Sequence, residues 1–360
     1  MAAWRSGSVA MRIKLFFFTV VFLGILAGCS SDDNSADAEY ILTYATPYPS
    51  SHPFSLADQE WMNAVIEQSQ GRIAFKPYWG GPVLNSDMSM LEIRHGLADI
   101  GLISPIYVKG GTHLIRAQAG FYGGVRSIED QVSVYNCLAK AFPQFEHELE
   151  GLVVLAVQGG NLPAIITKDK PINSLEDFSG MRLRAPAETV EVLRQLGADP
   201  VNMPMGEVYS ALAKGVIDGV VAPGDTIYSL RFSEVANHFT NIQFSRGGYP
   251  ARAMSEKTWN NLPSELQEII IGNRDTWEEA LSRLLKIAET RGLEFGQENG
   301  MQFHDFPYQD QLEFDQLYNS AALQQALSIA DIGIDAEPVF RAAQKILAAG
   351  SPINCEQSAL

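Results

Sequence analysis

The sequence predicts an α/β protein built from two lobes. In residues 181–231, short apolar runs alternate with two segments of helical period, which is typical of parallel strands joined by helices. Strand-like and helix-like segments also alternate from Tyr40 onward. From there to Leu360 the chain exceeds the roughly 250–300 residues at which single hydrophobic cores stop growing. We therefore expect two domains with a cleft between them.

The central stretch contains a candidate ligand anchor, Arg184. The expected strands of this stretch are 182–185, 198–202 and 216–221, and its expected helices are 189–196 and 207–214. Ligands of parallel sheets bind outside the carboxyl ends of the strands, and the first of these strands ends at Arg184-Ala185-Pro186. A guanidinium at this place can hold a carboxylate through two parallel hydrogen bonds without losing its charge. Spacing alone leaves an alternative, a surface arginine paired with Asp177 or Glu188.

The segment before this stretch is expected to form most of the first lobe. Strands are expected at 40–46, 71–79, 98–103 and 153–157, and helices at 53–70, 86–95 and 127–149. Three hydroxyl-bearing residues follow predicted strands and are candidate pocket residues: Tyr48, Ser104 and Tyr107. His52 lies in the same proline-rich loop as Tyr48 and is a further candidate. This loop can also pack only on itself, and Ser104 can equally cap the next helix.

The chain is expected to cross between the lobes more than once. A first crossing is expected at 159–167 and a return at 249–260, which gives predicted lobes of 40–160 with 250–285, and 161–249 with 286–360. Helical period continues almost unbroken from Glu265 to Gln297, either as one long helix or as two helices broken near Asn273. A strand at 301–306 and helices at 309–329 and 337–348 complete the expected elements.

The first residues have the pattern of a bacterial export signal with a lipid anchor. Two basic residues precede an apolar run at 15–27, which is too short for a membrane-spanning helix. It runs into Leu26-Ala27-Gly28-Cys29, which resembles a lipobox, in which the cysteine thiol is lipidated. Residues 1–28 are thus a predicted signal peptide, with Met11 as the expected initiator, and the acidic segment 29–39 is a predicted flexible tether. We expect an exported, membrane-anchored lipoprotein of the periplasm.

Composition and motif content point to ligand binding without covalent or redox chemistry. The chain carries a net charge of −16, which repels nucleic acid and anionic lipid, so no nucleic-acid partner is expected. It has no CxxC, GxSxG, GxxxxGK[ST] or GxGxxG pattern, and its six histidines are scattered. We therefore expect no catalytic residues, metal ions or cofactors. Whether Cys137 and Cys355 form a disulfide stays open at this point.

Five linked motifs, one just before the central stretch and four within it, carry a family resemblance. They lie in order at Pro171–Gly180, Arg182–Pro186, Leu196–Val201, Met203–Leu212 and Gly215–Gly219, with similar signatures at His52–Pro53, Gly71–Ile73 and Gly96–Asp99. Together they resemble the DctP-type solute-binding proteins of tripartite ATP-independent periplasmic (TRAP) transporters. The resemblance implies a two-lobe fold like that of periplasmic binding proteins, with a long helix spanning the hinge. It also implies that the protein binds an organic acid and delivers it to the small and large membrane subunits.

The same resemblance suggests how the cleft is lined near the anchor. By the family's pattern, Ala187 and Glu188 follow Arg184 into the cleft. Glu188 is expected either to orient the arginine, to bind a ligand hydroxyl or amine, or to act only as a first-turn helix acid. Where some relatives carry a second arginine, this chain has Ala164. We therefore expect a single carboxylate anchor and a ligand that is neither a dicarboxylate nor a highly polar sugar acid.

The opposite wall departs from the pattern of several relatives. Where these carry polar or aromatic side chains, this chain has Met205 and Ala222, which indicates an apolar wall and a less polar acid, aromatic or branched. Asp225 completes the candidate ligand-binding set, and its loop lacks the metal-bridging arrangement that some relatives use. Two other functions stay open: a binding protein for an ABC transporter or sensor, and a secreted hydrolase or isomerase that uses Glu188 with Asp225.

Overall fold

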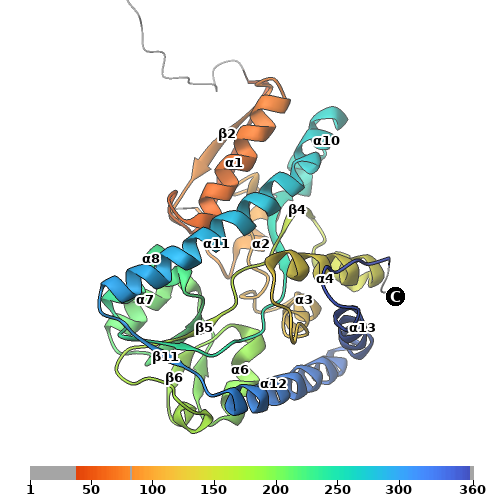
Figure 1. Ribbon diagram of the computed structural model, residues 1–360. Helices are drawn as coiled ribbons and strands as arrows, with labels where there is room; N and C mark the ends of the chain where they lie inside the picture. The colour runs from red at the N-terminus through yellow and green to blue at the C-terminus, as the bar shows by residue number, and fades with distance from the viewer. Residues whose placement is uncertain (1–37, 82, 357–360) are drawn as a thin grey trace, which may run out of the picture.

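The computed structural model describes residues 38–81 and 83–356, which fold into an α/β structure with two separate sheets (Figure 1). The first sheet has the strand order β2-β1-β3-β10-β4, and the second has the order β11-β9-β5-β8-β6-β7. The predicted α/β class with two lobes is therefore confirmed. The predicted signal peptide, Cys29 and most of the predicted tether lie outside the described residues.

The first sheet takes four strands from the first part of the chain and one that returns much later. Its strands are β1 (Tyr40–Ala45), β2 (Ile73–Tyr78), β3 (Ile100–Leu102), β4 (Leu152–Gln158) and β10 (Tyr249–Ser255). β1 pairs in parallel with β2 and β3, whereas β10 is antiparallel to β3 and β4. The helices of this part are α1 (Pro53–Gln68), α2 (Ser89–Arg94), α3 (His113–Gln118), α4 (Ile128–Ala141) and α5 (Gln144–Glu148).

Helix α1 shows why the sequence folds in this way locally. Pro53 occupies the first turn, where its missing N–H costs nothing, and the ring nitrogen Nδ1 of His52 accepts a hydrogen bond from the Phe54 backbone N–H at 3.2 Å. The buried side chains of α1 include Phe54, Trp61 and Val65, which recur at helical spacing. The proline-rich loop therefore ends as an N-cap, and its His52 lies at the start of the helix.

The second sheet takes five strands from between Ala164 and Asn241 and one late strand. Its strands are β5 (Ala164–Thr167), β6 (Arg182–Arg184), β7 (Asp199–Val201), β8 (Gly219–Ala222), β9 (His238–Asn241) and β11 (Gln302–Asp305). β6 pairs in parallel with both β7 and β8, as the β-α-β-α-β rhythm predicts. The connecting helices are α6 (Val190–Gln195), α7 (Met205–Ala213) and α8 (Asp225–Ser229), with short 3-10 turns at Leu175–Phe178, Ala187–Thr189 and Phe232–Glu234.

One expected helix is divided in the structure. The sequence predicts a single helix over 127–149, but α4 ends at Ala141 and α5 begins at Gln144. Pro143 explains the break, because a proline disfavours the helical conformation of the residue before it. Phe142 accordingly adopts an extended conformation, with φ −123° and ψ 106°.

The long helical segment is also divided, and its larger part joins the two lobes. α9 (Glu256–Trp259) and α10 (Ser264–Gly272) precede the 25-residue α11 (Arg274–Glu298), so the break falls at Asn273. A helix of this length extends about 37 Å. α11 packs against α1 of the first lobe and against α8 of the second, and Figure 1 shows it lying along both halves. The expectation of a long helix that spans the hinge therefore holds for α11.

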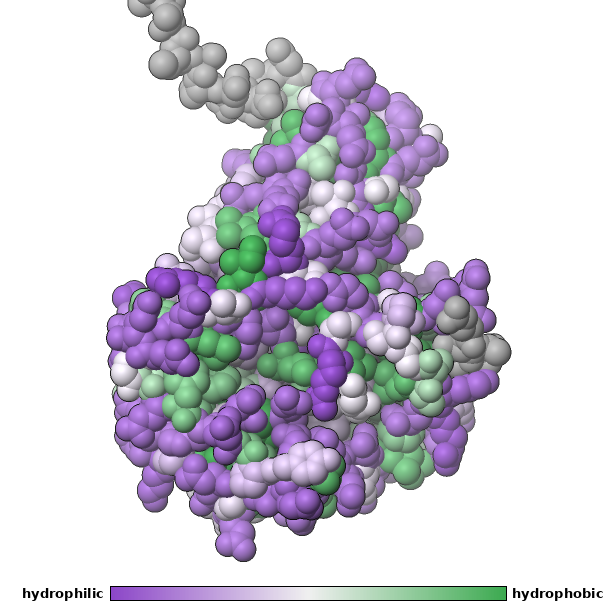
Figure 2. Space-filling model, viewed as in Figure 1, coloured by the Kyte–Doolittle hydropathy of each residue, from purple (hydrophilic) through white to green (hydrophobic). Residues whose placement is uncertain are grey.

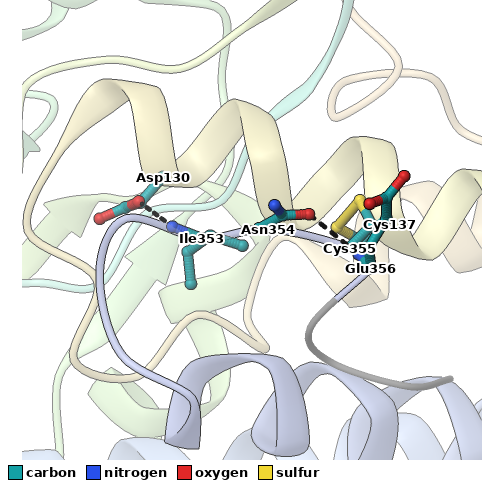
Figure 3. Close-up of a disulfide and its surroundings, with 6 residues drawn as sticks. All are labelled: Asp130, Cys137, Ile353, Asn354, Cys355 and Glu356. Carbon is teal, nitrogen blue, oxygen red and sulfur yellow. Dashed lines mark hydrogen bonds between the residues drawn. A yellow bond between two sulfur atoms is a disulfide. The ribbon is translucent and has the colours of Figure 1, made fainter.

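The C-terminal helices α12 (Tyr308–Ser328) and α13 (Glu337–Ala348) contact both halves of the molecule. α12 packs against α6 of the second half and α3 of the first, while α13 packs against α4. The end of the chain is tied to α4 as well, because Cys137 and Cys355 form a disulfide and the Ile353 N–H donates to Asp130 Oδ1 at 3.0 Å (Figure 3). We propose the lobe boundaries of the sequence prediction with one change, namely that α13 belongs to the first lobe.

Removing this disulfide is expected to destabilise the protein. The two cysteines are 218 residues apart in sequence, so the crosslink excludes many extended conformations of the unfolded chain. We expect Cys137→Ala combined with Cys355→Ala to lower the free energy of unfolding by about 2–4 kcal/mol. Urea unfolding with and without a reductant measures this change, because the reductant should affect only the wild type. Equal stability of the variant and the oxidised wild type would contradict the prediction.

Candidate functional site

A cavity lies between the two lobes and is lined by residues of both sheets and of α11. It encloses about 80 Å³, and a single water needs roughly 10–15 Å³ in the same measure, so several water-sized groups fit. Seven of the nine predicted ligand-binding residues line it: Tyr48, Ser104, Tyr107, Arg184, Glu188, Met205 and Asp225. The cavity therefore brings together residues that are far apart in sequence.

Arg184 is buried at the carboxyl end of β6, with 2% of its surface exposed. Its Nε donates to the Met203 carbonyl at 3.0 Å, and its Nη1 donates to the Val221 carbonyl at 3.2 Å. Its Nη2 donates to the hydroxyl of Tyr107, which belongs to the first lobe. These bonds fix the plane of the guanidinium and use three of its five N–H donors, so donors remain for a ligand. The bond to Tyr107 also connects the two lobes directly.

The proline-rich loop packs on itself and lines the cavity as well. The rings of Tyr48 and His52 lie 4.2 Å apart between centroids, and Phe54 contacts both of them. Burial lowers the pKa of His52 to about 3, and the nearby Arg252 acts in the same direction. This histidine is therefore neutral at physiological pH. It serves as a helix cap and an uncharged wall of the cavity.

Two predicted residues lie outside the cavity lining. Ala187 is half-buried and begins the 3-10 turn that carries Glu188. Ala222 is 1% exposed and packs in an apolar core with Val220 and Ile227. Side chains alternate between the two faces of a strand, and it is the neighbouring Val221 that lines the cavity. The predicted roles of Ala187 and Ala222 as wall residues are thus not supported by their positions.

A second arginine, Arg246, lines the cavity, although no sequence pattern singled it out. It lies in the segment between β9 and β10 and donates from Nη1 to the Asn161 carbonyl at 3.4 Å. A Cβ atom built on Gly160 would lie 2.4 Å from Arg246 Cζ, so a larger residue there would require the guanidinium to shift. Ala164, in contrast, is buried in the core of the second sheet. The cavity lining thus contains a second cation besides Arg184, and a different segment from the expected one supplies it.

Asp225 is held by residues from two segments, the one that contains Asn161 and α11. Its Oδ1 accepts from Asn161 Nδ2 at 3.0 Å, and the same amide donates to the Leu285 carbonyl at 2.9 Å. Glu289 on α11 accepts from the backbone N–H groups of Gly224 at 3.1 Å and Asp225 at 2.9 Å. The start of α8 is therefore attached to α11. Burial raises the pKa of Asp225, and its hydrogen bond with Asn161 partly offsets this.

Glu278 and Glu289 are expected to contribute stability that is lost as pH rises from about 4.5 through 7. Burial raises the pKa of Glu289 to about 7, with a further contribution from Asp225, and burial raises the pKa of Glu278 to about 7. The folded state then binds more protons than the unfolded state between the two pKa values, so folding is favoured at the acidic end. A difference of one between the folded and unfolded pKa of a group corresponds to about 1.4 kcal/mol of stability.

Urea unfolding at several pH values between 4.5 and 8 tests this pH dependence. Glu278→Gln should reduce the slope, because the glutamine amide does not titrate and its oxygen can still accept from the Val157 N–H. Glu265→Gln serves as a control, since this glutamate is exposed and its pKa is lowered. An unchanged pH slope in Glu278→Gln would contradict the prediction.

Neither a metal site nor a membrane-spanning helix is found in the part of the chain that the structure describes. In residues 38–81 and 83–356, no three side chains of the histidine, cysteine, aspartate or glutamate type form a group suited to a metal ion. Among the same residues, no helix combines the length and the apolar character needed to cross a membrane. Figure 2 agrees with the second observation, since the face that it shows is largely hydrophilic and its apolar residues form separate small patches.

Comparison with known proteins finds one family model and many similar structures. The model of the DctP family, described as bacterial extracellular solute-binding protein, family 7, matches residues 44–327. Among curated proteins, the sialic acid-binding periplasmic protein SiaP of Vibrio cholerae is 30% identical over 143 residues, which cover 38% of this chain and 42% of that protein. The similarity to SiaP thus covers less than half of either chain.

Two solved structures show how far the fold is shared. A TRAP solute-binding protein from Rhodoferax ferrireducens, in complex with copurified benzoate, has a TM-score of 0.80 at 22% identity and covers 89% of this chain and 99% of that one. A marine metagenome TRAP solute-binding protein specific for aromatic acid ligands, in complex with metahydroxyphenylacetate, has a TM-score of 0.77 at 23% identity and covers 87% and 99%. At this identity the similarity establishes the fold alone.

Proposed function

Because this chain belongs to the DctP family of bacterial extracellular solute-binding proteins, we propose that it captures an organic monocarboxylate in the cavity between its lobes. The observation that carries the proposal is Arg184, a buried cation that ends β6 and lines this cavity. The family and the similar structures are solute-binding proteins, so the protein is not an enzyme. The alternative of a hydrolase or isomerase that uses Glu188 with Asp225 is thereby excluded.

The transporter that the protein serves is proposed to be of the TRAP type. The motifs from Pro171 to Gly219 and the names of the two similar structures support this assignment. The protein would deliver its ligand to the small and large membrane subunits, anchored in the periplasm by the lipidated Cys29. Service to an ABC transporter or a sensor is the alternative. Neighbouring genes for two integral-membrane subunits would favour the TRAP assignment.

The chemistry of the cavity supports a monocarboxylate with an apolar body. Arg184 and Arg246 supply two cations, and a carboxylate can accept hydrogen bonds from a guanidinium in a fixed plane. Apolar side chains, among them Leu102, Ile106 and Met205, form part of the remaining wall. The two similar structures contain benzoate and metahydroxyphenylacetate, which are both aromatic monocarboxylates. The apolar part of the wall therefore favours an acid with an aromatic or branched body.

Delivery requires that the ligand stabilise the closed arrangement of the lobes. Arg184 donates to Tyr107, which lies in the other proposed lobe, so this hydrogen bond would form on closure and break on opening. A ligand that contacts residues of both lobes binds the closed state more tightly than the open state. A difference of about 5.5 kcal/mol would shift the populations from 1:99 to 99:1. The proposed function requires only that the ligand bind the closed state more tightly than the open state, and it requires no chemical step.

A thermal-shift screen with pairs of acids and their amides tests the proposal. Benzoate with benzamide, phenylacetate with phenylacetamide, and isobutyrate with isobutyramide differ in charge but little in shape. A ligand that binds only the folded state raises the melting temperature with its concentration. We expect at least one acid to do so and its amide not to. Equal shifts from both members of each pair, or no shift from any acid, would contradict a carboxylate site.

A further inference from the structure

We propose that Glu188 determines specificity by accepting a hydrogen bond from the ligand, so that the ligand is a monocarboxylate that also carries a hydroxyl or ammonium donor. This inference rests on the proposed function, since it concerns the same cavity. It adds a second recognition point to the carboxylate anchor. The ligand would be held at its carboxylate by Arg184 and at its donor by Glu188.

The first argument is the position of Glu188 and the state of its carboxylate. It lies four residues after Arg184, in the short turn Ala187–Thr189, and its side chain lines the cavity. Within residues 38–81 and 83–356, its Oε2 atom is buried and has no hydrogen-bond partner. A buried carboxylate oxygen without a donor is costly, because it has lost its water and gained no replacement. A donor on a ligand in the cavity would remove this cost.

The second argument is that the cavity's other charged groups have partners of their own. Arg184 donates to two backbone carbonyls and to Tyr107, and Arg246 donates to the Asn161 carbonyl. Asp225 accepts from the side chain of Asn161. None of these hydrogen bonds involves Glu188. Burial also raises the pKa of Glu188, which the attraction of Arg246, Arg184 and Arg116 partly offsets.

The third argument is the balance of charge in the cavity. Its charged lining residues are Arg184, Arg246, Glu188 and Asp225, whose formal charges cancel. A simple carboxylate leaves this cavity with one uncompensated negative charge. A ligand that also carries an ammonium group is neutral overall, and one that carries a hydroxyl supplies the missing donor without changing the charge. Both classes of ligand carry an O–H or N–H donor whose hydrogen bond Glu188 can accept.

The competing role for Glu188 is a counter-ion that only balances the nearby arginines. In that role its removal would change the affinity for every carboxylate by a similar factor. In the proposed role its removal would weaken donor-bearing ligands selectively. The ratio of two dissociation constants, measured for ligands that differ in one group, therefore separates the two roles.

The experiment uses calorimetry on the full chain with two matched series of acids. The first series is phenylacetate, which has no donor beside its carboxylate, mandelate, which has a hydroxyl there, and phenylglycine, which has an ammonium group there. The second series is benzoate and 3-hydroxybenzoate, which differ by a hydroxyl on the ring. In the wild type we expect a donor-bearing member to bind about tenfold or more tightly than its parent, since a site built for hydrogen bonding rejects analogues that lack the group. In Glu188→Ala this ratio should fall to about one.

Two further variants sharpen the result. Glu188→Gln keeps an oxygen acceptor but loses the charge, so a hydroxyl preference should partly survive and an ammonium preference should disappear. Glu176→Ala, an exposed glutamate of the same lobe, should leave all ratios unchanged. Binding of carboxylates without any preference in the wild type, or an unchanged ratio in Glu188→Ala, would overturn the inference alone. Failure of the wild type to bind any of the five acids would overturn the proposed function together with it.

Discussion

Replacing Arg184 by alanine is expected to weaken carboxylate binding by roughly 30- to 4000-fold. Loss of one partner of a desolvated charge pair costs about 2–5 kcal/mol. Arg184 is 2% exposed, and its guanidinium is held in place by the Met203 and Val221 carbonyls. The ligand's carboxylate would then keep only Arg246 of the two arginines that line the cavity. Calorimetry with an acid that raises the melting temperature measures the loss directly.

The companion variants separate charge, geometry and folding. Arg184→Lys should recover only part of the affinity, because an ammonium group cannot make the two parallel hydrogen bonds of a guanidinium. Arg182→Ala is the matched control, since Arg182 lies two residues earlier on β6, is exposed and pairs with Asp199. Its removal should leave the affinity unchanged. An unchanged affinity in Arg184→Ala, with its fold intact by circular dichroism, would show that the anchor lies elsewhere.

The position of Arg184 could be predicted because parallel sheets impose it. The carboxyl ends of parallel strands meet at one edge, and ligands bind there, so an arginine that ends such a strand faces a cleft. Ala222 was placed in the wall from the family's pattern alone, which did not take into account that side chains alternate along a strand. The neighbouring Val221 lines the cavity, whereas Ala222 packs in the apolar core.

Arg246 could not be predicted from periodicity, since it lies outside the helices and strands. Its guanidinium packs against Gly160, which lies 86 positions earlier in the chain. The one usable signal was topological: Arg246 precedes β10, the strand that returns to the first lobe, and each crossing passes the cleft.

The predicted end of the helix at 127–149 was wrong for a related reason. The break at Pro143 follows from local sterics, which apolar periodicity alone does not register.

The largest effect on stability is expected from Asp58→Ala, which should lower the free energy of unfolding by about 3–5 kcal/mol. Asp58 lies on α1 and is fully buried. It accepts hydrogen bonds from Arg252 Nε at 2.6 Å, from Arg252 Nη2 at 3.2 Å, from Trp277 Nε1 at 2.7 Å and from the hydroxyl of Tyr44. One carboxylate thus joins α1 to β1, β10 and α11. Without it, the buried Arg252 keeps its charge and loses its partner.

The structure offers a matched control two residues further along α1. Glu60 also pairs with an arginine, Arg283 on α11, at 2.6 Å, but both side chains are about half exposed. Exposed pairs contribute about 0–1 kcal/mol, so Glu60→Ala should be nearly neutral in urea unfolding. Replacing the buried pair together, as Asp58→Leu with Arg252→Met, should recover much of the loss, because no unpaired charge remains. If Asp58→Ala is no more destabilising than Glu60→Ala, burial is not what makes this ion pair important.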